Sequence, residues 1–348
     1  MSTEFRELLK KVGSGQHTSK GLSRSEAADA LQMMIDGVAT PAQIGGFLIS
    51  HRIKRPTGIE IAGMLDTYDK LSTKLTAIAP EKTVYILGIP YDGRSRTAPI
   101  SPITSLILKT VGIPVVMHGG DRLPTKYGIP LIEIWQHLGL DFQQLSVAQL
   151  QDYFTANEFA LCYAPTLLPD STNLISYREE IGKRPPIATL ELIWSPYAGD
   201  NIHTLAGYVH PPTEEIIRDT FTERGNQPYT LIKGLEGSGD LRISQTTIVV
   251  TNQTDAETGI EYLKPNPYDH GLGGEDVAID TLEVYVQSLE ALLKGEESTL
   301  LNTAIWNGGF YLWHCGAAAD LKAGIKQASN LIQSGQLAET LEQLKAGL

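Results

Sequence analysis

The order of apolar and polar positions divides this chain into two parts, and the first part is helical. Three amphipathic patterns follow one another within residues 1–72, and each begins at a capping sequence. The capping sequences are Ser23-Arg-Ser-Glu26, Thr40-Pro41-Ala-Gln43 and Thr57-Gly-Ile-Glu60. A Ser or Thr followed three residues later by Glu or Gln satisfies two free backbone N–H groups at a helix start. The pattern predicts three short helices that pack as a bundle.

From Thr83 onward, short apolar runs alternate with helical patterns. The strand candidates are Val84–Leu87, Val115–Met117, Phe159–Tyr163, Tyr229–Ile232 and Thr246–Val250. Helical patterns cover 101–111, 130–138, 146–154 and 213–224, with two more near 276–293 and 316–332. The segment 255–274, rich in Gly, Pro and Asp, is predicted to be a loop. Strands that alternate with helices indicate an α/β domain with a central mixed, mostly parallel sheet.

Composition and net charge exclude several classes of protein. Of 348 residues, 42% are hydrophobic and 20% charged, as in ordinary globular proteins. No apolar run approaches the roughly 18 residues of a membrane span, and the N-terminus lacks a signal-peptide core, so we expect no membrane association and a cytoplasmic location. Cys162 and Cys315 show no metal-type spacing and are expected to be reduced thiols. The net charge of −12 disfavours a nucleic-acid partner.

The segment Gly88-Ile-Pro-Tyr-Asp-Gly93 lies between a strand and a helical pattern, where a glycine loop can hold an anion. Pro90 has no N–H to donate, and Tyr91 adds bulk where the backbone needs to approach a phosphate. Arg94 and Arg96 follow directly, and guanidinium groups grip phosphate well. These two arginines either replace the lost backbone donors or form a solvated loop tip.

Several of these segments, in this order, resemble the anthranilate phosphoribosyltransferase family. Gly88–Gly93 stands for the family's Gly-Thr-Gly-Gly-Asp-Gly, and Thr97-Ala-Pro-Ile-Ser101 for its Thr-x-Asn-Ile-Ser. Met117-His-Gly-Gly-Asp121 replaces its Lys-His-Gly-Asn-Arg, and Tyr177-Arg178-Glu-Glu-Ile-Gly182 resembles its Val-Arg-x-x-Leu-Gly. The resemblance implies a fold of the nucleoside phosphorylase and phosphoribosyltransferase type. It also implies a helical domain over 1–75, joined by 170–200, and an α/β domain over 80–348.

In that family the glycine loop holds the pyrophosphate of phosphoribosyl pyrophosphate. The resemblance therefore implies substrate-binding roles for Gly88, Asp92, Gly93, Arg94, Arg96, Thr97, Ser101, His118, Gly119 and Lys126. Asp121, in place of an arginine, counts against a normal donor site. Arg178 stands where the family binds the acceptor's carboxylate; the alternative is a salt bridge between domains.

A weakened Mg²⁺ site is implied by the same comparison. Ser101 aligns with a hydroxyl that helps to coordinate the ion, although serine at that place is also a common helix cap. The family's Asp-Glu pair falls in the glycine segment 234–244, where Asp240 is the candidate ligand and Glu236 a second one. A polar loop with a solvated aspartate is the alternative.

The resemblance implies an enzyme that transfers phosphoribosyl to an aromatic or heterocyclic amine, acting as a homodimer through its N-terminal helices. The alternative is a catalytically silent relative that binds another anion, such as single-stranded nucleic acid. Two features suggest this alternative. The loop has lost glycines, and the chain carries a set of basic residues: Arg94, Arg96, Arg122, Lys126, Lys183 and Arg184.

Overall fold

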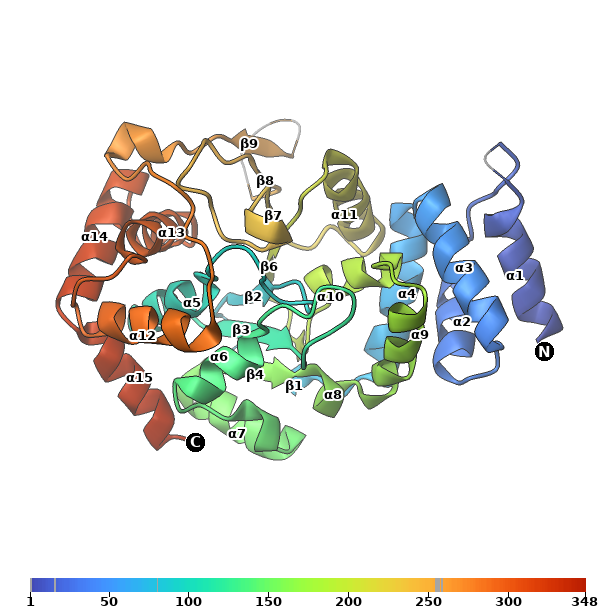
Figure 1. Cartoon of the computed structure of the whole chain (residues 1–348), viewed down its shortest axis with the longest axis horizontal. Helices are drawn as coiled ribbons and strands as arrows, with labels where there is room; N and C mark the ends of the chain where they lie inside the picture. The colour runs from blue at the N-terminus through green and yellow to red at the C-terminus, as the bar shows by residue number, and fades with distance from the viewer. Residues whose placement is uncertain (1, 16, 80, 254–256, 258) are drawn as a thin grey trace.

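The computed structural model describes residues 2–15, 17–79, 81–253, 257 and 259–348, and it separates a helical bundle from a sheet domain (Figure 1). The bundle comprises α1 (Thr3–Gly13), α2 (Arg24–Ile35), α3 (Pro41–Lys54) and α4 (Gly58–Leu71). The last three are the helices that the capping sequences predict, and all three capping boxes form. The sequence analysis missed α1, whose N-cap Ser2 accepts a hydrogen bond from the N–H of Phe5 at 3.1 Å.

The α/β domain contains a seven-stranded sheet of order β4-β3-β2-β6-β7-β8-β9. Its strands are β2 (Val84–Gly88), β3 (Val115–Gly119), β4 (Phe159–Tyr163), β6 (Ile202–Gly207), β7 (Tyr229–Ile232), β8 (Val249–Thr251) and β9 (Glu261–Leu263). The first five strands in that order pair in parallel, and β8 and β9 pair antiparallel at one edge. The predicted fold class, a bundle with a mixed, mostly parallel sheet, is confirmed.

Two strands differ from the sequence-based expectation. Strand β6 lies in the middle of the sheet between β2 and β7, yet none of the predicted strands covers it. His203 and Thr204 interrupt its apolar run, and both are buried because their neighbours on β2 and β7 enclose them. Strand β9 and a short helix, η5 (Pro267–His270), fall within the segment 255–274, which was expected to be a loop. Residues 255, 256 and 258 of that segment lie outside the described part.

Helices cover both faces of this sheet (Figure 1). They are α5 (Ser101–Thr110), α6 (Leu131–His137), α7 (Val147–Asn157), α11 (Pro211–Glu223), α12 (Leu282–Leu293), α13 (Leu301–His314), α14 (Leu321–Gln333) and α15 (Gln336–Ala346). The first four match their predictions closely, whereas α12 and α14 begin several residues later than expected. Helix α13 packs against α5 and α14 and is buried on every side from Thr303 to Leu312, so it shows no amphipathic pattern.

A connecting segment leaves β4, packs against the bundle and returns to β6. It comprises α8 (Ala164–Leu167), η2 (Pro169–Leu174), α9 (Ile175–Glu180), η3 (Pro186–Thr189) and α10 (Leu190–Ile193). Its members contact α2, α3 and α4, and β1 (Leu75–Thr76) pairs with β5 (Tyr197–Ala198) beside them. The segment therefore carries side chains of α9 and α10 into the space between bundle and sheet.

Cys162 and Cys315 are both free thiols, as expected, with Cys162 buried and Cys315 partly buried. Among the described residues, no helix combines the length and apolar character that a bilayer crossing needs.

Candidate functional site

The candidate site begins at the loop between β2 and α5, at the carboxyl edge of the parallel strands. Both of its end glycines are required by packing. A Cβ at Gly88 would stand 1.7 Å from the carbonyl oxygen of Leu192. Gly93 has φ +73°, and a Cβ there would lie 2.5 Å from the carbonyl of Gly128. These approaches explain why the glycines occur here without reference to a ligand.

The backbone after Gly93 forms an anion cradle, and the carboxylate of Glu236 occupies it. The N–H groups of Arg96 and Thr97 donate to Glu236 Oε1 at 3.0 and 2.9 Å, and that of Ser95 reaches Oε2 at 3.4 Å. The Thr97 hydroxyl donates at 2.9 Å, and the Lys126 ammonium forms an ion pair with Oε2. Two predicted substrate-binding residues, Thr97 and Lys126, are thus brought together on an anion that belongs to the chain.

Glu236 holds this position under backbone strain. Its φ is +53°, in the left-handed region that costs a non-glycine residue on the order of 1 kcal/mol. Burial alone would raise the pKa of its carboxyl. The hydrogen bonds from Lys126 and the Thr97 N–H outweigh burial and hold that pKa well below its ordinary value. Glu236 is therefore ionised at neutral pH, and its negative charge is paired with the positive charge of Lys126.

Arg94 lies beneath the cradle rather than at a solvated loop tip. Its Nη1 donates to Asp240 Oδ2 at 2.6 Å and to Ser238 Oγ at 2.7 Å, and its Nη2 donates to Thr97 Oγ1 at 2.5 Å. Ser101 Oγ donates to Asp240 Oδ1 at 2.7 Å. The two predicted metal ligands, Ser101 and Asp240, are thus in contact, with a guanidinium beside them.

This arrangement does not fit a Mg²⁺ ion. Mg²⁺ needs carboxylate oxygens that are free to approach it. Glu236 is held by Lys126, and both oxygens of Asp240 accept hydrogen bonds, one of them from Arg94. Within the described ranges, no cluster of three or more His, Cys, Asp or Glu side chains is placed to hold a metal.

The remaining loop residues lie in different surroundings. Asp92 is buried, and its Oδ1 stands 3.8 Å from Arg184 Nη2. The Arg96 side chain is 77% exposed, and its Nε lies 3.7 Å from Glu236 Oε2. Gly119 ends β3, and a Cβ added there would meet no atom within 4 Å, so the backbone at this point borders open space.

Tyr91, which is hydrogen bonded to His118, connects the loop to a cavity. His118 is fully buried, and desolvation lowers its pKa to about 3, so the imidazole is neutral. The Tyr91 hydroxyl and His118 Nδ1 form a hydrogen bond of 2.5 Å. The ring that replaces a glycine of the family loop therefore becomes part of the cavity wall.

The cavity itself lies between the connecting segment and the loop, with a volume of about 150 Å³. Its aromatic walls are Tyr68, Tyr91, Tyr163 and Trp194. Arg178 on α9 and Glu191 on α10 lie on the same wall, and Arg178 Nη1 donates to Glu191 Oε1 at 2.6 Å. Arg178 thus lines a cavity and forms a buried salt bridge, but its partner belongs to the same connecting segment, so the bridge does not run between the two domains.

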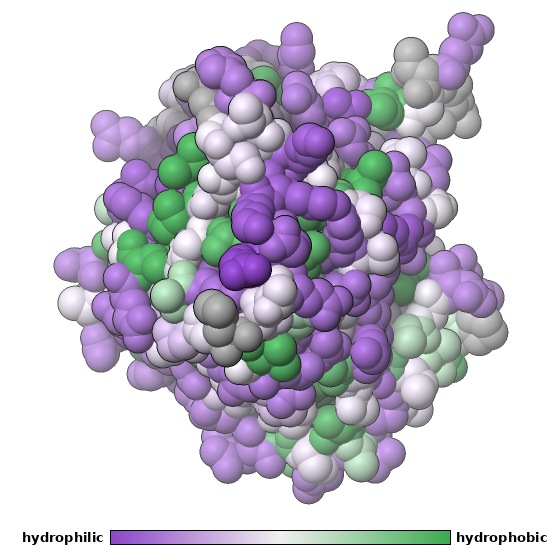
Figure 2. Space-filling view, turned by 90° about the vertical axis from the view of Figure 1, so that its right-hand side faces the viewer, coloured by the Kyte–Doolittle hydropathy of each residue, from purple (hydrophilic) through white to green (hydrophobic). Residues whose placement is uncertain are grey.

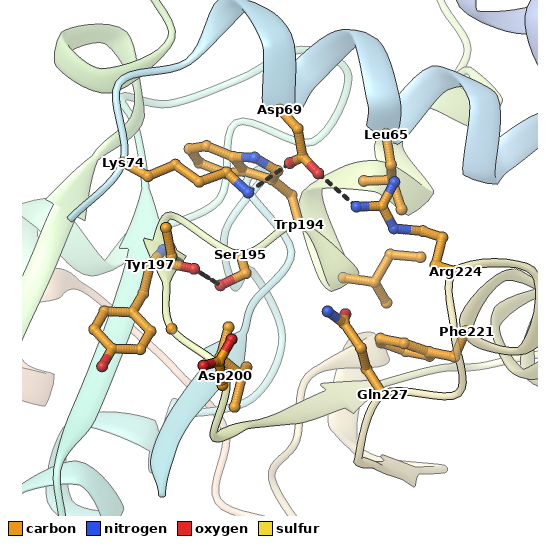
Figure 3. A pocket seen from close by; sticks show the side chains of 14 residues that line it. Leu65, Asp69, Lys74, Trp194, Ser195, Tyr197, Asp200, Phe221, Arg224 and Gln227 are labelled. Carbon is orange, nitrogen blue, oxygen red and sulfur yellow. Dashed lines mark hydrogen bonds and ion pairs between the residues drawn. The ribbon is translucent and has the colours of Figure 1, made fainter. Parts of the chain in front are cut away.

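A larger cavity of about 350 Å³ opens near the amino end of β6 (Figure 3). Asp69 lies between Lys74 and Arg224, at 2.6 and 2.5 Å, and the Ser195 hydroxyl donates to the carbonyl of Tyr197. Arg224 Nη1 also pairs with Asp66 at 2.5 Å, so both cations of this cavity are engaged by carboxylates. Ligands of open α/β sheets bind at the carboxyl ends of strands, so the smaller cavity is the better candidate site.

Three of the basic residues that motivated a nucleic-acid alternative are paired with carboxylates of the chain. Arg94 is bonded to Asp240, Lys126 to Glu236, and Arg122 donates to Glu133 at 2.7 and 2.6 Å. The charge of these three residues is balanced within the chain, whereas the Arg96 side chain stays exposed.

Sequence reasoning missed Glu191 and the internal role of Glu236. Glu191 lies in the apolar run 187–194, where a single carboxylate is itself a signal because buried charges need a partner. No local pattern shows that the partner is Arg178. For Glu236, the signal is an acidic residue within a glycine segment that follows a strand.

Comparison with known proteins places the whole chain in one group. Residues 6–71 match the helical bundle domain of a glycosyl transferase family, and residues 92–338 match the a/b domain of that family. Anthranilate phosphoribosyltransferase of Azorhizobium caulinodans is 29% identical over 98% of this chain and 95% of its own length. The enzyme of Afipia carboxidovorans is 27% identical over 99% and 98%.

Solved structures agree on the fold. Anthranilate phosphoribosyltransferase of Saccharomyces cerevisiae, in complex with PRPP and Mg, has a TM-score of 0.82 at 15% identity and covers 100% of this chain and 98% of its own. Anthranilate phosphoribosyltransferase of Thermus thermophilus has a TM-score of 0.75 at 20% identity, covering 97% and 98%.

Proposed function

This chain belongs to the glycosyl transferase family with a helical bundle domain and an α/β domain, and from that membership we propose that it is a phosphoribosyltransferase. It transfers phosphoribosyl from phosphoribosyl pyrophosphate to an aromatic or heterocyclic amine. The amine nitrogen attacks C1 of the ribose, the bond from C1 to the pyrophosphate oxygen breaks with inversion, and the amine releases a proton. The transition state is oxocarbenium-like, so positioning of the reactants and neutralisation of the leaving group supply most of the catalysis.

The observation that carries the proposal is the anion cradle at 95–97 with Lys126 beside it. Three backbone N–H groups and an ammonium converge on one carboxylate. A phosphate of the substrate presents the same kind of charged acceptor. Tyr91 joins this loop to the cavity that holds Arg178, so donor and acceptor sites adjoin. Glu236 must leave the cradle when the pyrophosphate enters.

The yeast relatives have been solved with Mg bound, one of them together with PRPP. In this chain the carboxylates of Asp240 and Glu236 are held by Arg94 and Lys126. We therefore propose that these two cations, and not a Mg²⁺ ion, neutralise charge at the donor site in the arrangement described here.

Calorimetric titration with phosphoribosyl pyrophosphate, with and without Mg²⁺, tests the proposal, together with an assay for released pyrophosphate in the presence of an aromatic amine. We expect binding, and at least a tenfold loss of affinity in Lys126→Ala. Lys326→Ala, an exposed lysine of α14, is the matched control and should bind as the unaltered protein does. If millimolar phosphoribosyl pyrophosphate with Mg²⁺ does not bind, the proposed function is wrong.

We also propose that the chain forms a homodimer through its N-terminal helices. Figure 2 shows the bundle end of the molecule, where apolar residues are interspersed among polar ones. Ile53 on α3 is 76% exposed and Val38, just after α2, is 52% exposed. Burial of these side chains against a second copy would remove apolar surface from water. The division into 1–75 with 170–200 and 80–348, and the cytoplasmic location, stay predictions.

A further inference from the structure

A third cavity, the arginine groove, has a volume of about 580 Å³ and lies apart from the donor and acceptor sites proposed above. Arg52 and Arg55 at the end of α3 line it together with Arg184 of the connecting segment and residues 208–213, which join β6 to α11. None of its described lining residues belongs to the cradle at 95–97 or to the 150 Å³ cavity. Ligand pockets measure about 300–1,000 Å³, so the groove is large enough for a small organic molecule.

The arginine groove carries a surplus of positive charge. Its described lining includes three arginines and no carboxylate. In the part of the chain that the structure describes, neither Arg52 nor Arg55 forms an ion pair, and both are exposed. Arg184 approaches a carboxylate, that of Asp92, only at 3.8 Å. Because the whole chain has a net charge of −12, this group of uncompensated cations is a local exception.

The nearby carboxylates of the chain are engaged by other cations. Glu214, in the first turn of α11, pairs with Arg218 at 2.5 Å. Glu236, the neighbour in sequence of the groove residue Gly237, pairs with Lys126. Helix α11 begins at the groove, so the positive end of its dipole adds to the field of the arginines. The counter-charge for the groove therefore has to come from outside the chain.

The backbone holds two of the arginines in place. The Nη1 of Arg52 donates to the carbonyl of Arg184 at 2.6 Å, which ties the bundle to the connecting segment at the groove. Arg55 follows α3 with φ +66° and ψ +128°, a conformation that a residue with a side chain rarely adopts. Backbone strain of this kind is often kept where a side chain serves a function.

The rest of the lining suits a ring. It is largely apolar and includes Pro56, Pro185, Leu192, Tyr208, Val209 and Ile216. Prolines have a fixed backbone angle, so this surface loses little freedom when a ligand covers it. Guanidinium groups bind phosphate through two parallel hydrogen bonds. The groove thus combines an anchor for a phosphate with an apolar surface beside it.

We propose that the arginine groove binds a small phosphate monoester that carries a ring, as a nucleoside monophosphate does. The phosphate lies among the guanidinium groups of Arg52, Arg55 and Arg184, and the ring packs against the prolines. A phosphate with two negative charges matches three cations better than a single carboxylate does. A small molecule is favoured over a nucleic-acid strand, because the net charge of −12 opposes a longer polyanion.

Calorimetric titration of the full chain with adenosine monophosphate, adenosine and inorganic phosphate tests the inference. Adenosine monophosphate should bind at least about tenfold more tightly than either of the others, because only it engages the arginines and the apolar surface together. Equal binding of adenosine, or no binding of adenosine monophosphate at millimolar concentration, would overturn the inference. Tighter binding of a short single-stranded oligonucleotide would also overturn it and would favour a nucleic-acid partner.

Arg55→Ala removes one cation of the groove without breaking an ion pair. It should weaken the binding of adenosine monophosphate at least about tenfold, the effect expected when a charge-assisted hydrogen bond is lost. Lys326→Ala removes the same charge from the exposed side of α14 and should leave the affinity unchanged. If Arg55→Ala does not fold, Arg184→Gln provides the same test. An unchanged affinity in a folded variant of this pair contradicts the inference.

Lys126→Ala separates the arginine groove from the donor cradle. Adenosine monophosphate should bind this variant as tightly as it binds the unaltered chain, because Lys126 does not line the groove. Loss of binding in Lys126→Ala, with none in Arg55→Ala, would assign the nucleotide to the cradle and overturn the inference. The inference does not depend on the proposed function: a chain that binds adenosine monophosphate at the groove but not phosphoribosyl pyrophosphate contradicts only the transferase.

Discussion

Arg94 and Asp240 form a buried ion pair, with 2.6 Å between Nη1 and Oδ2 and exposed side-chain fractions of 3% and 2%. Removing one partner of such a pair leaves an uncompensated charge in the interior, which typically costs about 3–5 kcal/mol. We expect Arg94→Ala to lower the free energy of unfolding by that amount, measured by urea denaturation at pH 7.

Arg96 provides the control for this prediction, because it belongs to the same loop and its side chain is 77% exposed. Arg96→Ala should change the free energy of unfolding by no more than about 0.5 kcal/mol. Similar losses in both variants would mean that Arg94 makes no special contribution to the folded state.

Glu236 occupies the cradle at 95–97, and we expect it to compete there with external anions. Glu236→Gln removes the carboxylate charge while Lys126 and the loop N–H groups remain. We expect the affinity for pyrophosphate, measured by calorimetry without metal, to rise at least about tenfold, which corresponds to about 1.4 kcal/mol. Glu342→Gln should bind pyrophosphate as the unaltered chain does. A fall in affinity would show that Glu236 helps to hold the ligand rather than excluding it.

Glu60 couples the stability of the bundle to pH. Burial alone would raise the pKa of this carboxyl, but His51, the N–H of Leu22 and the Lys54 ammonium lower it from 4.5 to about 2. A depressed pKa means that the stabilisation is complete above the ordinary value and is lost as the pH falls through 4.5 toward 2. The loss has an upper limit of roughly 3 kcal/mol.

Urea denaturation of the unaltered chain and of Glu60→Gln between pH 7 and pH 2 measures this contribution. The variant should be less stable at pH 7, and the two proteins should converge at the acid end. Parallel curves over the whole range would rule out Glu60 as the group responsible.

Ile53 tests the proposed dimer. An aspartate at this exposed position of α3 would place a charge in the contact between two copies, so Ile53→Asp should sediment as a monomer in analytical ultracentrifugation. Val284→Asp is the control, because Val284 is 48% exposed on α12, far from the bundle in Figure 1. A dimer that survives Ile53→Asp and a matching change at Val38 would exclude this interface.

Local patterns predicted the parts of the fold that local interactions specify. The capping boxes at Ser23, Thr40 and Thr57 form because each uses only residues within one helical turn. Strand β6 and helix α13 escaped prediction because neighbours far away in the sequence bury them on all sides. An element that is enclosed on all sides needs no alternation of polar and apolar residues.

For the candidate site too, the sequence predicted some features and not others. The sequence singled out Arg94, Ser101, Lys126, Arg178 and Asp240, and the structure finds all five at the cradle or the cavity. Their partners were not predictable. Arg94 and Asp240 are separated by 146 residues, and no short motif links two such positions.

By itself, the sequence determined the helical bundle, the mostly parallel sheet, the family and the residues that carry charge at the site, because periodicity, capping and motif order are local properties of a chain. Only the tertiary structure decided what those charges do. The fold places Glu236 in the anion cradle, Arg94 on Asp240, and Glu191 on Arg178. Electrostatic attraction in a buried place depends on distance and dehydration, and both are set only when distant segments pack together.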